Sequence, residues 1–182
     1  MFIEDVDEEI TLRMLANKDA KPLFEITNRS REYLREWLPW LDDTQTVEDS
    51  LSFIQNGFQL YAERKGLTVG VFYLDELVGI AGYNYFDWTN HIAEIGYWLS
   101  IDSQGKGIMR RVVRFLTECA FHQFDMNRVV IHTAYDNKKS QTIPKSIGYK
   151  NEGQLRQVEW LYDHYVDHIV WGMLKEDWIM TN

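Results

Sequence analysis

The sequence predicts one domain of mixed α and β structure, in which a largely antiparallel sheet carries helices on its faces. The 182 residues fit a single domain that spans 1–182. Apolar and polar residues alternate between 67 and 99, as expected for consecutive strands joined by tight turns. After residue 107, apolar residues recur at helical spacing and are followed by further strand-like segments, so helices and strands are interleaved.

The N-terminal part is expected to begin with a short strand and to continue with helices. Apolar residues alternate with polar ones over 10–14, which predicts the strand. Asp19 stands where it can cap the first helix, and Thr46 with Asp49 forms a loose capping box before the third. The expected helices start at residue 20, cover about 30–38, and extend from 46 to about 65.

Strands dominate the middle of the chain and alternate with helices after it. The dipeptide Asp75-Glu76 separates two strand-like runs and predicts a hairpin. Gly107 precedes an amphipathic helix whose apolar stripe includes Cys119. Strands are expected over 67–74, 77–86, 91–99, 128–135, 149–154 and 165–174, and a short helix over 138–147.

Composition excludes several classes of protein. The formal net charge of −9 argues against a general nucleic-acid-binding protein, so no direct nucleic-acid partner is expected. Cys119 is the single cysteine, which rules out an internal disulfide, and no apolar run is long enough to cross a membrane. The acidic first residues do not resemble a secretion signal, so we expect a cytoplasmic protein without a membrane partner. Seven tryptophans and ten tyrosines leave room for a homo-oligomeric contact.

Basic charge is concentrated in residues 101–150, which contain nine Lys or Arg and four Asp or Glu. Within this stretch lies a glycine loop, SQGKGIM at 103–109, between an expected strand and an expected helix. Glycines allow a close approach of the backbone to a ligand, and free N–H groups at a helix start attract phosphate. The loop lacks the Ser or Thr of a Walker motif after Lys106, and Arg110 replaces the third glycine of a Rossmann fingerprint. Taken alone, it is equally consistent with a solvated turn.

The loop resembles the acyl-CoA-binding loop of the GNAT N-acetyltransferases, Gln/Arg-x-x-Gly-x-Gly/Ala. Gln104 and Gly107 match this pattern, and Met109 replaces its final small residue. Other segments are similar to the RimJ/RimL-like branch, the ribosomal-protein N-terminal acetyltransferases and their relatives. These segments are REWLPW (35–40), EIGYWL (94–99), NKKS (137–140), IGY (147–149) with EG (152–153), and the stretch from Asp167 to Trp178. The resemblance extends over about residues 10–178.

This resemblance implies a GNAT fold, with a central, mostly antiparallel twisted sheet of about seven strands flanked by helices. It implies that the strands at 91–99 and 128–135 splay apart, and that acetyl-CoA, the acetyl donor, binds in the gap. Backbone N–H groups of the loop would hold the pyrophosphate at the helix N-terminus. The residues implied to bind the donor are Trp98, Leu99, Gln104, Gly105, Lys106, Gly107, Ile108, Met109, Asn137 and Ser140.

An acceptor amine must lose a proton before it attacks the thioester, so the reaction needs a base. The resemblance places a base at Glu159, nineteen residues after Ser140, and many GNAT enzymes keep a catalytic glutamate on the strand that contains Glu94. We favour Glu159 over Glu94, and ordered water or another residue is the third alternative. Ser140 is the implied hydrogen-bond donor to the departing thiolate, although a serine is also an ordinary helix-start residue.

Trp37, Leu38 and Trp40 are expected to line the acceptor groove, and a helix end packed on the core is the alternative. The acceptor is expected to be a protein N-terminal amine or a small amine, such as a polyamine or an amino sugar of an antibiotic. A GNAT domain that binds acyl-CoA without catalysis is a different class of answer. No metal is expected, because His164 and His168 would lie more than about 12 Å apart on a strand.

Overall fold

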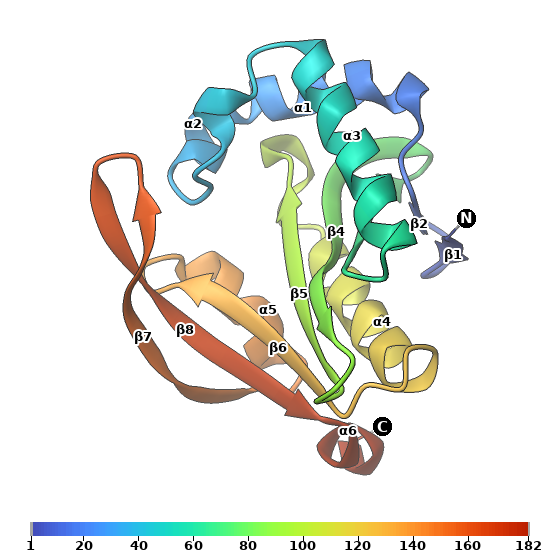
Figure 1. The fold of residues 1–182 in the computed structure, drawn as a ribbon, viewed down its shortest axis with the longest axis vertical. Helices are drawn as coiled ribbons and strands as arrows, with labels where there is room; N and C mark the ends of the chain where they lie inside the picture. The colour runs from blue at the N-terminus through green and yellow to red at the C-terminus, as the bar shows by residue number, and fades with distance from the viewer. Residues whose placement is uncertain (1, 182) are drawn as a thin grey trace.

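A computed structural model describes residues 2–181 and contains an eight-stranded sheet with helices packed against it (Figure 1). The strands lie in the order β1-β2-β3-β4-β5-β6-β8-β7, so β8 is inserted between β6 and β7. The pair β5–β6 is parallel and the other neighbouring pairs are antiparallel. The mixed, mostly antiparallel sheet expected from the sequence is confirmed.

The bounds of the elements are as follows. The strands are β1 (Ile3–Asp5), β2 (Ile10–Arg13), β3 (Leu67–Tyr73), β4 (Glu76–Asp87), β5 (Ile92–Leu99), β6 (Arg128–Ala134), β7 (Lys150–Leu161) and β8 (His164–Leu174). The helices are α1 (Ala20–Arg29), α2 (Arg31–Arg35), α3 (Val47–Ala62), α4 (Ile108–His122), α5 (Lys138–Ser146) and α6 (Lys175–Thr181). Single 3-10 turns lie at Asn17–Asp19, Leu41–Asp43 and Ile101–Ser103.

The observed elements differ from the expected ones at several positions along the chain. β1 adds an eighth strand, which its three residues, two of them acidic, are too short and too polar to predict. The helix expected over about 30–38 ends at Arg35, and β7 continues to Leu161 instead of ending near 154. The final helix α6 was not expected at all.

The two expected helix caps have different outcomes. Thr46 and Asp49 form the capping box of α3, in which Thr46 Oγ1 accepts the Asp49 N–H at 3.2 Å. Asp19 does not cap α1 with its side chain, so that expectation was wrong. Its carboxylate instead accepts two hydrogen bonds from Arg13, at 2.7 and 2.9 Å, and one from the Ala16 N–H at 2.7 Å. A guanidinium supplied by β2 therefore takes precedence over the local cap.

The β3–β4 hairpin turns one residue earlier than expected. Its central residues are Leu74 and Asp75, with φ of 50° and 68°, and β4 begins at Glu76. Two residues with positive φ give the turn the twist that suits a tight hairpin. Leucine rarely adopts this conformation, which is why the sequence favoured Asp75-Glu76.

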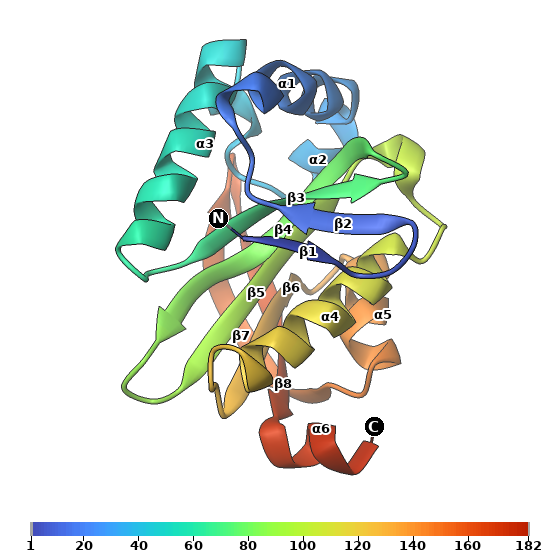
Figure 2. The same ribbon diagram turned by 90° about the vertical axis from the view of Figure 1, so that its right-hand side faces the viewer.

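Helices cover both faces of the sheet (Figure 2). α1 and α3 pack on the face formed by β3 and β4, in a cluster that includes Leu23, Ile54 and Ile80. α4 packs on the opposite face, where its Val112 and Leu116 belong to the main core cluster. That cluster also contains the following residues of the central strands: Val69, Ala93, Ile95, Val129, Ile131, Ile169 and Trp171. The alternate residues of β5, β6 and β8 therefore face away from α4.

The central strands β5 and β6 splay apart, as the family resemblance implied (Figure 1). Their parallel pairing is limited to Ile92–Arg128, Ala93–Val129 and Glu94–Val130. Beyond Glu94, β5 stays paired with β4 and β6 stays paired with β8. The sheet is thus open between β5 and β6 toward Leu99.

Two further expectations concern the core and the membrane. Cys119 is buried, and burial raises the pKa of its thiol to about 12, so it is a core residue and not a nucleophile. Within residues 2–181, no helix combines the length and the apolar character needed to span a membrane.

Candidate active site

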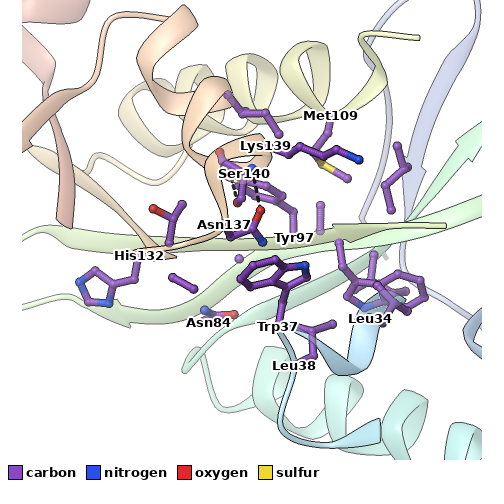
Figure 3. A pocket seen from close by; sticks show the side chains of 18 of the residues that line it. Leu34, Trp37, Leu38, Asn84, Tyr97, Met109, His132, Asn137, Lys139 and Ser140 are labelled. Atoms are coloured by element: carbon purple, nitrogen blue, oxygen red, sulfur yellow. Dashed lines mark hydrogen bonds between the residues drawn. The ribbon is translucent and has the colours of Figure 1, made fainter. Parts of the chain in front are cut away.

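A cavity of about 1170 Å³ lies where β5 and β6 diverge. The α2 segment with the residues after it, the glycine loop, α5 and the strands β5, β6, β7 and β8 contribute to its wall. Trp37 and Leu38 lie on one side of the sheet in this region, and Met109 and Ser140 lie on the other (Figure 3). Every residue expected from the sequence to form the site lines this cavity, except Lys106.

The glycine loop presents open backbone at the start of α4. Gly105 and Gly107 have φ of 78° and 71°, in the left-handed region that favours glycine. A Cβ added at either position would meet nothing within 4 Å, so space is open above the backbone. Gly107 is the N-cap of α4 and provides no side-chain acceptor, which leaves the first N–H groups of the helix available. This open, donor-rich turn fits a diphosphate.

The basic residues around the loop do not all face the cavity. Lys106 lies over the ring of Tyr73, at 5.4 Å from the ring centre. Arg111 is not part of the cavity wall and is held by Asp7 and Glu9, both at 2.8 Å. Arg110 does line the cavity. The positive charge of this stretch therefore serves partly to anchor the β1–β2 turn to α4.

Asn137 and Ser140 lie together at the start of α5. Asn137 is the N-cap, and its Oδ1 accepts the Ser140 N–H at 3.0 Å (Figure 3). The Ser140 hydroxyl donates to the hydroxyl of Tyr97 at 3.3 Å, and Tyr97 donates to the Ser140 carbonyl at 3.2 Å. Burial raises the pKa of Tyr97 to about 12, so its hydroxyl stays protonated near neutral pH. The Ser140 N–H thus takes part in the cap of α5, while its side chain lies in the cavity wall.

The two candidate bases both face the cavity and both have partners. The Glu94 side chain is 15% exposed; Oε1 accepts a hydrogen bond from Asn84 at 2.8 Å, and Oε2 is 3.5 Å from His132 Nδ1. The Glu159 side chain is 27% exposed, and its Oε2 is 2.9 Å from His168 Nε2. Both carboxyl groups therefore contribute acidic side chains to the cavity wall.

Aromatic residues form the wall opposite the glycine loop. Trp40 packs on Trp98 of β5, with ring centres 6.1 Å apart, and Trp37 and Leu38 line the cavity beside them. The hydroxyl of Tyr162, in the β7–β8 turn, donates to the Leu38 carbonyl at 2.5 Å and accepts the Leu41 N–H at 3.2 Å. The hairpin tip is therefore fastened to the segment that follows α2.

Several of these residues were not found from the sequence. Tyr97 belongs to the EIGYWL segment but was given no role of its own, and Asn84, Tyr162, His132 and His168 carried no motif. His132 and His168 both fall on expected strands and on the face that later proves to be the cavity side. That alternation was the one available signal, and it needed the sheet order to become informative.

The splayed strands and the helix start open to phosphate are the features that the family resemblance implied for an acyl-CoA site. The GNAT acetyltransferase domain family matches residues 9–150. The putative ribosomal N-acetyltransferase YdaF of Bacillus subtilis (strain 168) is 32% identical, over 98% of this chain and 98% of its own length. The ribosomal-protein-serine acetyltransferase of Escherichia coli (strain K12) is 31% identical, over 89% and 90%.

A solved structure gives the same result. The microcin C7 self-immunity acetyltransferase MccE, in complex with acetyl-CoA and AMP, is 29% identical with a TM-score of 0.88, and the match covers 93% of this chain and 94% of that one. The chain belongs to the GNAT acetyltransferase family, and its homologues include proteins named as ribosomal-protein acetyltransferases, which are of the RimJ/RimL-like kind. It is an N-acetyltransferase, and acetyl-CoA is the donor in this family.

Among residues 2–181, no group of three or more His, Cys, Asp or Glu side chains is arranged to hold a metal ion. His164 begins β8 beside Asp163, whereas His168 faces Glu159 in the cavity.

Proposed function

We propose that this protein transfers the acetyl group of acetyl-CoA to the N-terminal α-amino group of a protein, by direct attack of the amine on the thioester. The observation that carries the proposal is one cavity that joins the open glycine turn before α4 to the carboxylates Glu94 and Glu159. A donor anchored at the turn and an amine held by the carboxylates would meet where β5 and β6 diverge. The ribosomal-protein names of the relatives support a protein acceptor.

The donor site is proposed to use backbone more than side chains. The N–H groups of Ile108 and Met109 would bind the pyrophosphate at the N-terminus of α4. Trp98 and Leu99 end the part of β5 that lacks a β6 partner, so their backbone is available to the pantetheine arm. Acetyl-CoA supplies the activated acetyl group. Asn137 uses Oδ1 in its cap, which leaves its amide NH₂ for the pantetheine.

Glu159 is the proposed base. One carboxylate oxygen of Glu159, Oε2, is held by His168, which leaves the other oxygen for the amine. Both oxygens of Glu94 already face protein partners, Asn84 and His132. Glu94 is the second candidate. Ser140 is proposed to turn its hydroxyl from Tyr97 to the sulfur of the departing thiolate. That hydrogen bond would stabilise the negative charge that develops on the sulfur.

The acceptor groove favours an extended chain with a free amine at its end. Trp37, Leu38 and Trp40 give it an apolar wall, and the hairpin tip held by Tyr162 borders it. A flexible protein N-terminus can enter such a groove, while an internal loop of a folded protein would have to enter doubled back. A small-amine acceptor is the alternative. Because the solved structure of MccE is a complex with acetyl-CoA and AMP, an aminoacyl nucleotide is included among the acceptors tested below.

The test is thiol release from acetyl-CoA with a panel of acceptors. The panel contains peptides with N-terminal Ser and Ala, the same peptides with blocked N-termini, a polyamine, an amino sugar and an aminoacyl nucleotide. We expect release with the free peptides and none with the blocked ones. If a small amine is preferred to the peptides, the acceptor is a small molecule and not a protein N-terminus. If CoA binds tightly but no amine causes thiol release, the protein is a non-catalytic sensor of acyl-CoA.

A further inference from the structure

A row of polar side chains crosses five neighbouring strands on the cavity face of the sheet. Its members are Asn84 on β4, Glu94 on β5, His132 on β6, His168 on β8 and Glu159 on β7. These strands are consecutive in the sheet although they are far apart in the chain. All five side chains line the same cavity. In Figure 3, His132 and Asn84 lie at the same end of that cavity, beyond Trp37.

The members of the row contact one another in order. Asn84 donates to Glu94 at 2.8 Å, and Glu94 lies 3.5 Å from His132 Nδ1. The rings of His132 and His168 are 6.1 Å apart between centres, which is the spacing of diagonal neighbours on β6 and β8. His168 Nε2 meets Glu159 at 2.9 Å. Each histidine therefore has a carboxylate of its own, and the two pairs lie side by side on one face of the sheet.

Local irregularities of the strands place both ends of the row. The pairing of β4 with β5 shifts between Tyr83 and Tyr85, so Asn84 is the extra residue of a bulge. Gly96 leaves room for it, because a Cβ at Gly96 would collide with the side-chain amide of Asn84. At the other end, the pairing of β7 with β8 is irregular between Leu155 and Glu159. Bulges of this kind re-aim side chains and are frequent beside active sites.

We propose that His132 and His168 conduct the proton that leaves the acceptor amine, with Glu159 as the point where it enters. This inference rests on the proposed acetyl transfer and deepens it. Imidazole accepts and releases protons near neutral pH, and a carboxylate partner fixes which ring nitrogen carries the proton. A carboxylate without an imidazole partner lacks this ability to exchange protons near neutral pH.

The protons of the reaction balance along this route. The acceptor enters as an ammonium, gives one proton to the Glu159–His168 pair, and its nitrogen then forms a bond to the acetyl carbon. The carbon–sulfur bond breaks and its electron pair goes to the sulfur. The nitrogen loses a second proton on becoming an amide. Of the two protons, one ends on the thiol sulfur and the other passes through His168 and His132 to water.

The charged and titratable groups around the two histidines come from every neighbouring strand. Glu94 faces them from β5 and Glu159 from β7. The Arg128–Glu152 ion pair lies toward the closed end of the same face, and burial together with Glu94 raises the pKa of Tyr85 on β4. Other charged or titratable side chains of the cavity wall belong to Tyr33, Tyr97, Arg110 and Lys139. His132 and His168 are the imidazole groups in this set, and imidazole is the side chain best suited to relay protons.

The kinetic test compares His132→Gln, His168→Gln and the double variant with wild type at saturating peptide. We expect kcat at neutral pH to fall at least about tenfold in the double variant. The fall of kcat at acid pH, where the row is protonated and cannot accept the amine's proton, should move to lower pH or disappear. His122→Gln is the matched control, because His122 forms a His–Glu pair with Glu118 at 3.1 Å on α4, outside the cavity. A uniform loss of rate with an unchanged pH profile would mean that the cavity histidines are only structural.

A second measurement is independent of turnover. Proton–nitrogen correlation spectra of the histidine rings in the CoA-bound protein report which ring nitrogen carries the proton. We expect Glu159→Gln to change the signals of His168 and, through it, those of His132, while His122 is unaffected. If neither cavity histidine responds, the row is not linked and the inference fails. If the histidines respond but no amine is acetylated, the proposed function fails on its own.

Discussion

The hydroxyl of Tyr162 donates a hydrogen bond to the carbonyl of Leu38, across 124 positions of the chain. Arg35 stacks over the same tyrosine ring at 3.8 Å and is paired with Asp42 at 2.8 Å. One side chain therefore holds the β7–β8 tip against the segment after α2, at the border of the proposed acceptor groove.

Tyr162→Phe should loosen this border while keeping the ring that Arg35 contacts. We expect the KM for a peptide acceptor to rise severalfold and the KM for acetyl-CoA to stay unchanged, because the donor end of the cavity is remote from the hairpin tip. Loss of the hydrogen bonds should lower the free energy of unfolding by about 1 kcal/mol. Steady-state kinetics and urea unfolding check both values. Equal increases in both KM values would argue against a role at the acceptor end.

Gly107→Glu should abolish CoA binding. The substitution places a carboxylate at the start of α4, where a diphosphate is proposed to bind, and a side chain at a φ of 71°. Gly107→Ala is the control, since it introduces the same backbone strain, about 1–2 kcal/mol, without the charge. Calorimetry with CoA should detect no heat for the Glu variant and weakened binding for the Ala variant. Unchanged affinity of the Glu variant would remove the loop from the donor site.

Glu159→Gln should reduce kcat by about a hundredfold, because the amine loses its proposed proton acceptor. The rate should also gain less from a rise in pH than it does in wild type, and CoA binding should be retained. Glu94→Gln is the comparison variant and should have the smaller effect on kcat. The opposite ranking in the same pH–rate series would assign the base to Glu94.

Ser140→Ala should lower kcat with little change in either KM, because the proposed hydrogen bond to sulfur forms as the thiolate departs. Tyr97→Phe should have a smaller effect, and the double variant should show a coupling energy of about 0.5–1 kcal/mol, since the two hydroxyls are bonded. Burial raises the pKa of Tyr97 to about 12, so the effect of Tyr97→Phe should be constant between about pH 6 and 9. A strong pH dependence there would show that Tyr97 itself exchanges protons.

Asp19→Asn should destabilise the fold at neutral pH by roughly 2 kcal/mol, because Arg13 loses a charged partner. Burial raises the pKa of the Asp19 carboxyl, but hydrogen bonds from Arg13 and the Ala16 N–H outweigh it and leave the pKa below its ordinary value. A depressed pKa in the folded state stabilises the protein above the ordinary range of aspartate, and this stabilisation is lost as the pH falls through the folded-state value. Urea unfolding should therefore show a difference in the free energy of unfolding between wild type and variant at pH 7, and this difference should become smaller at about pH 3. A difference of constant size would contradict the ion pair.

The sequence predicted those parts of the site whose residues follow one another in the chain. The glycine loop, the Asn137–Ser140 helix start and the Trp37–Trp40 segment each carry their chemistry within a few positions, and all line the cavity. Glu94 and Glu159 were found because each stands at a position that the family resemblance marks.

The remaining features depend on which strands become neighbours. His132 and His168 meet because β8 is inserted next to β6, an order that no local pattern encodes. Asn84 reaches the cavity through a bulge, and Tyr162 acts through a contact with Leu38. The turn at Leu74 and the side chain of Asp19 also departed from local rules, in the latter case because a guanidinium from β2 outcompeted the helix end.

The short ladder between β5 and β6 has a mechanical consequence. With pairing limited to residues 92–94 on β5, the half-sheets β1–β5 and β6–β8–β7 are joined by little backbone. The apolar layer beneath α4 and the side-chain hydrogen bonds Tyr97–Ser140 and Tyr162–Leu38 also connect them. A molecule bound in the opening would contact both half-sheets and hold them together. Substrate occupancy should therefore restrict a hinge at Glu94, and amide exchange along both facing strand edges should slow together when CoA is added.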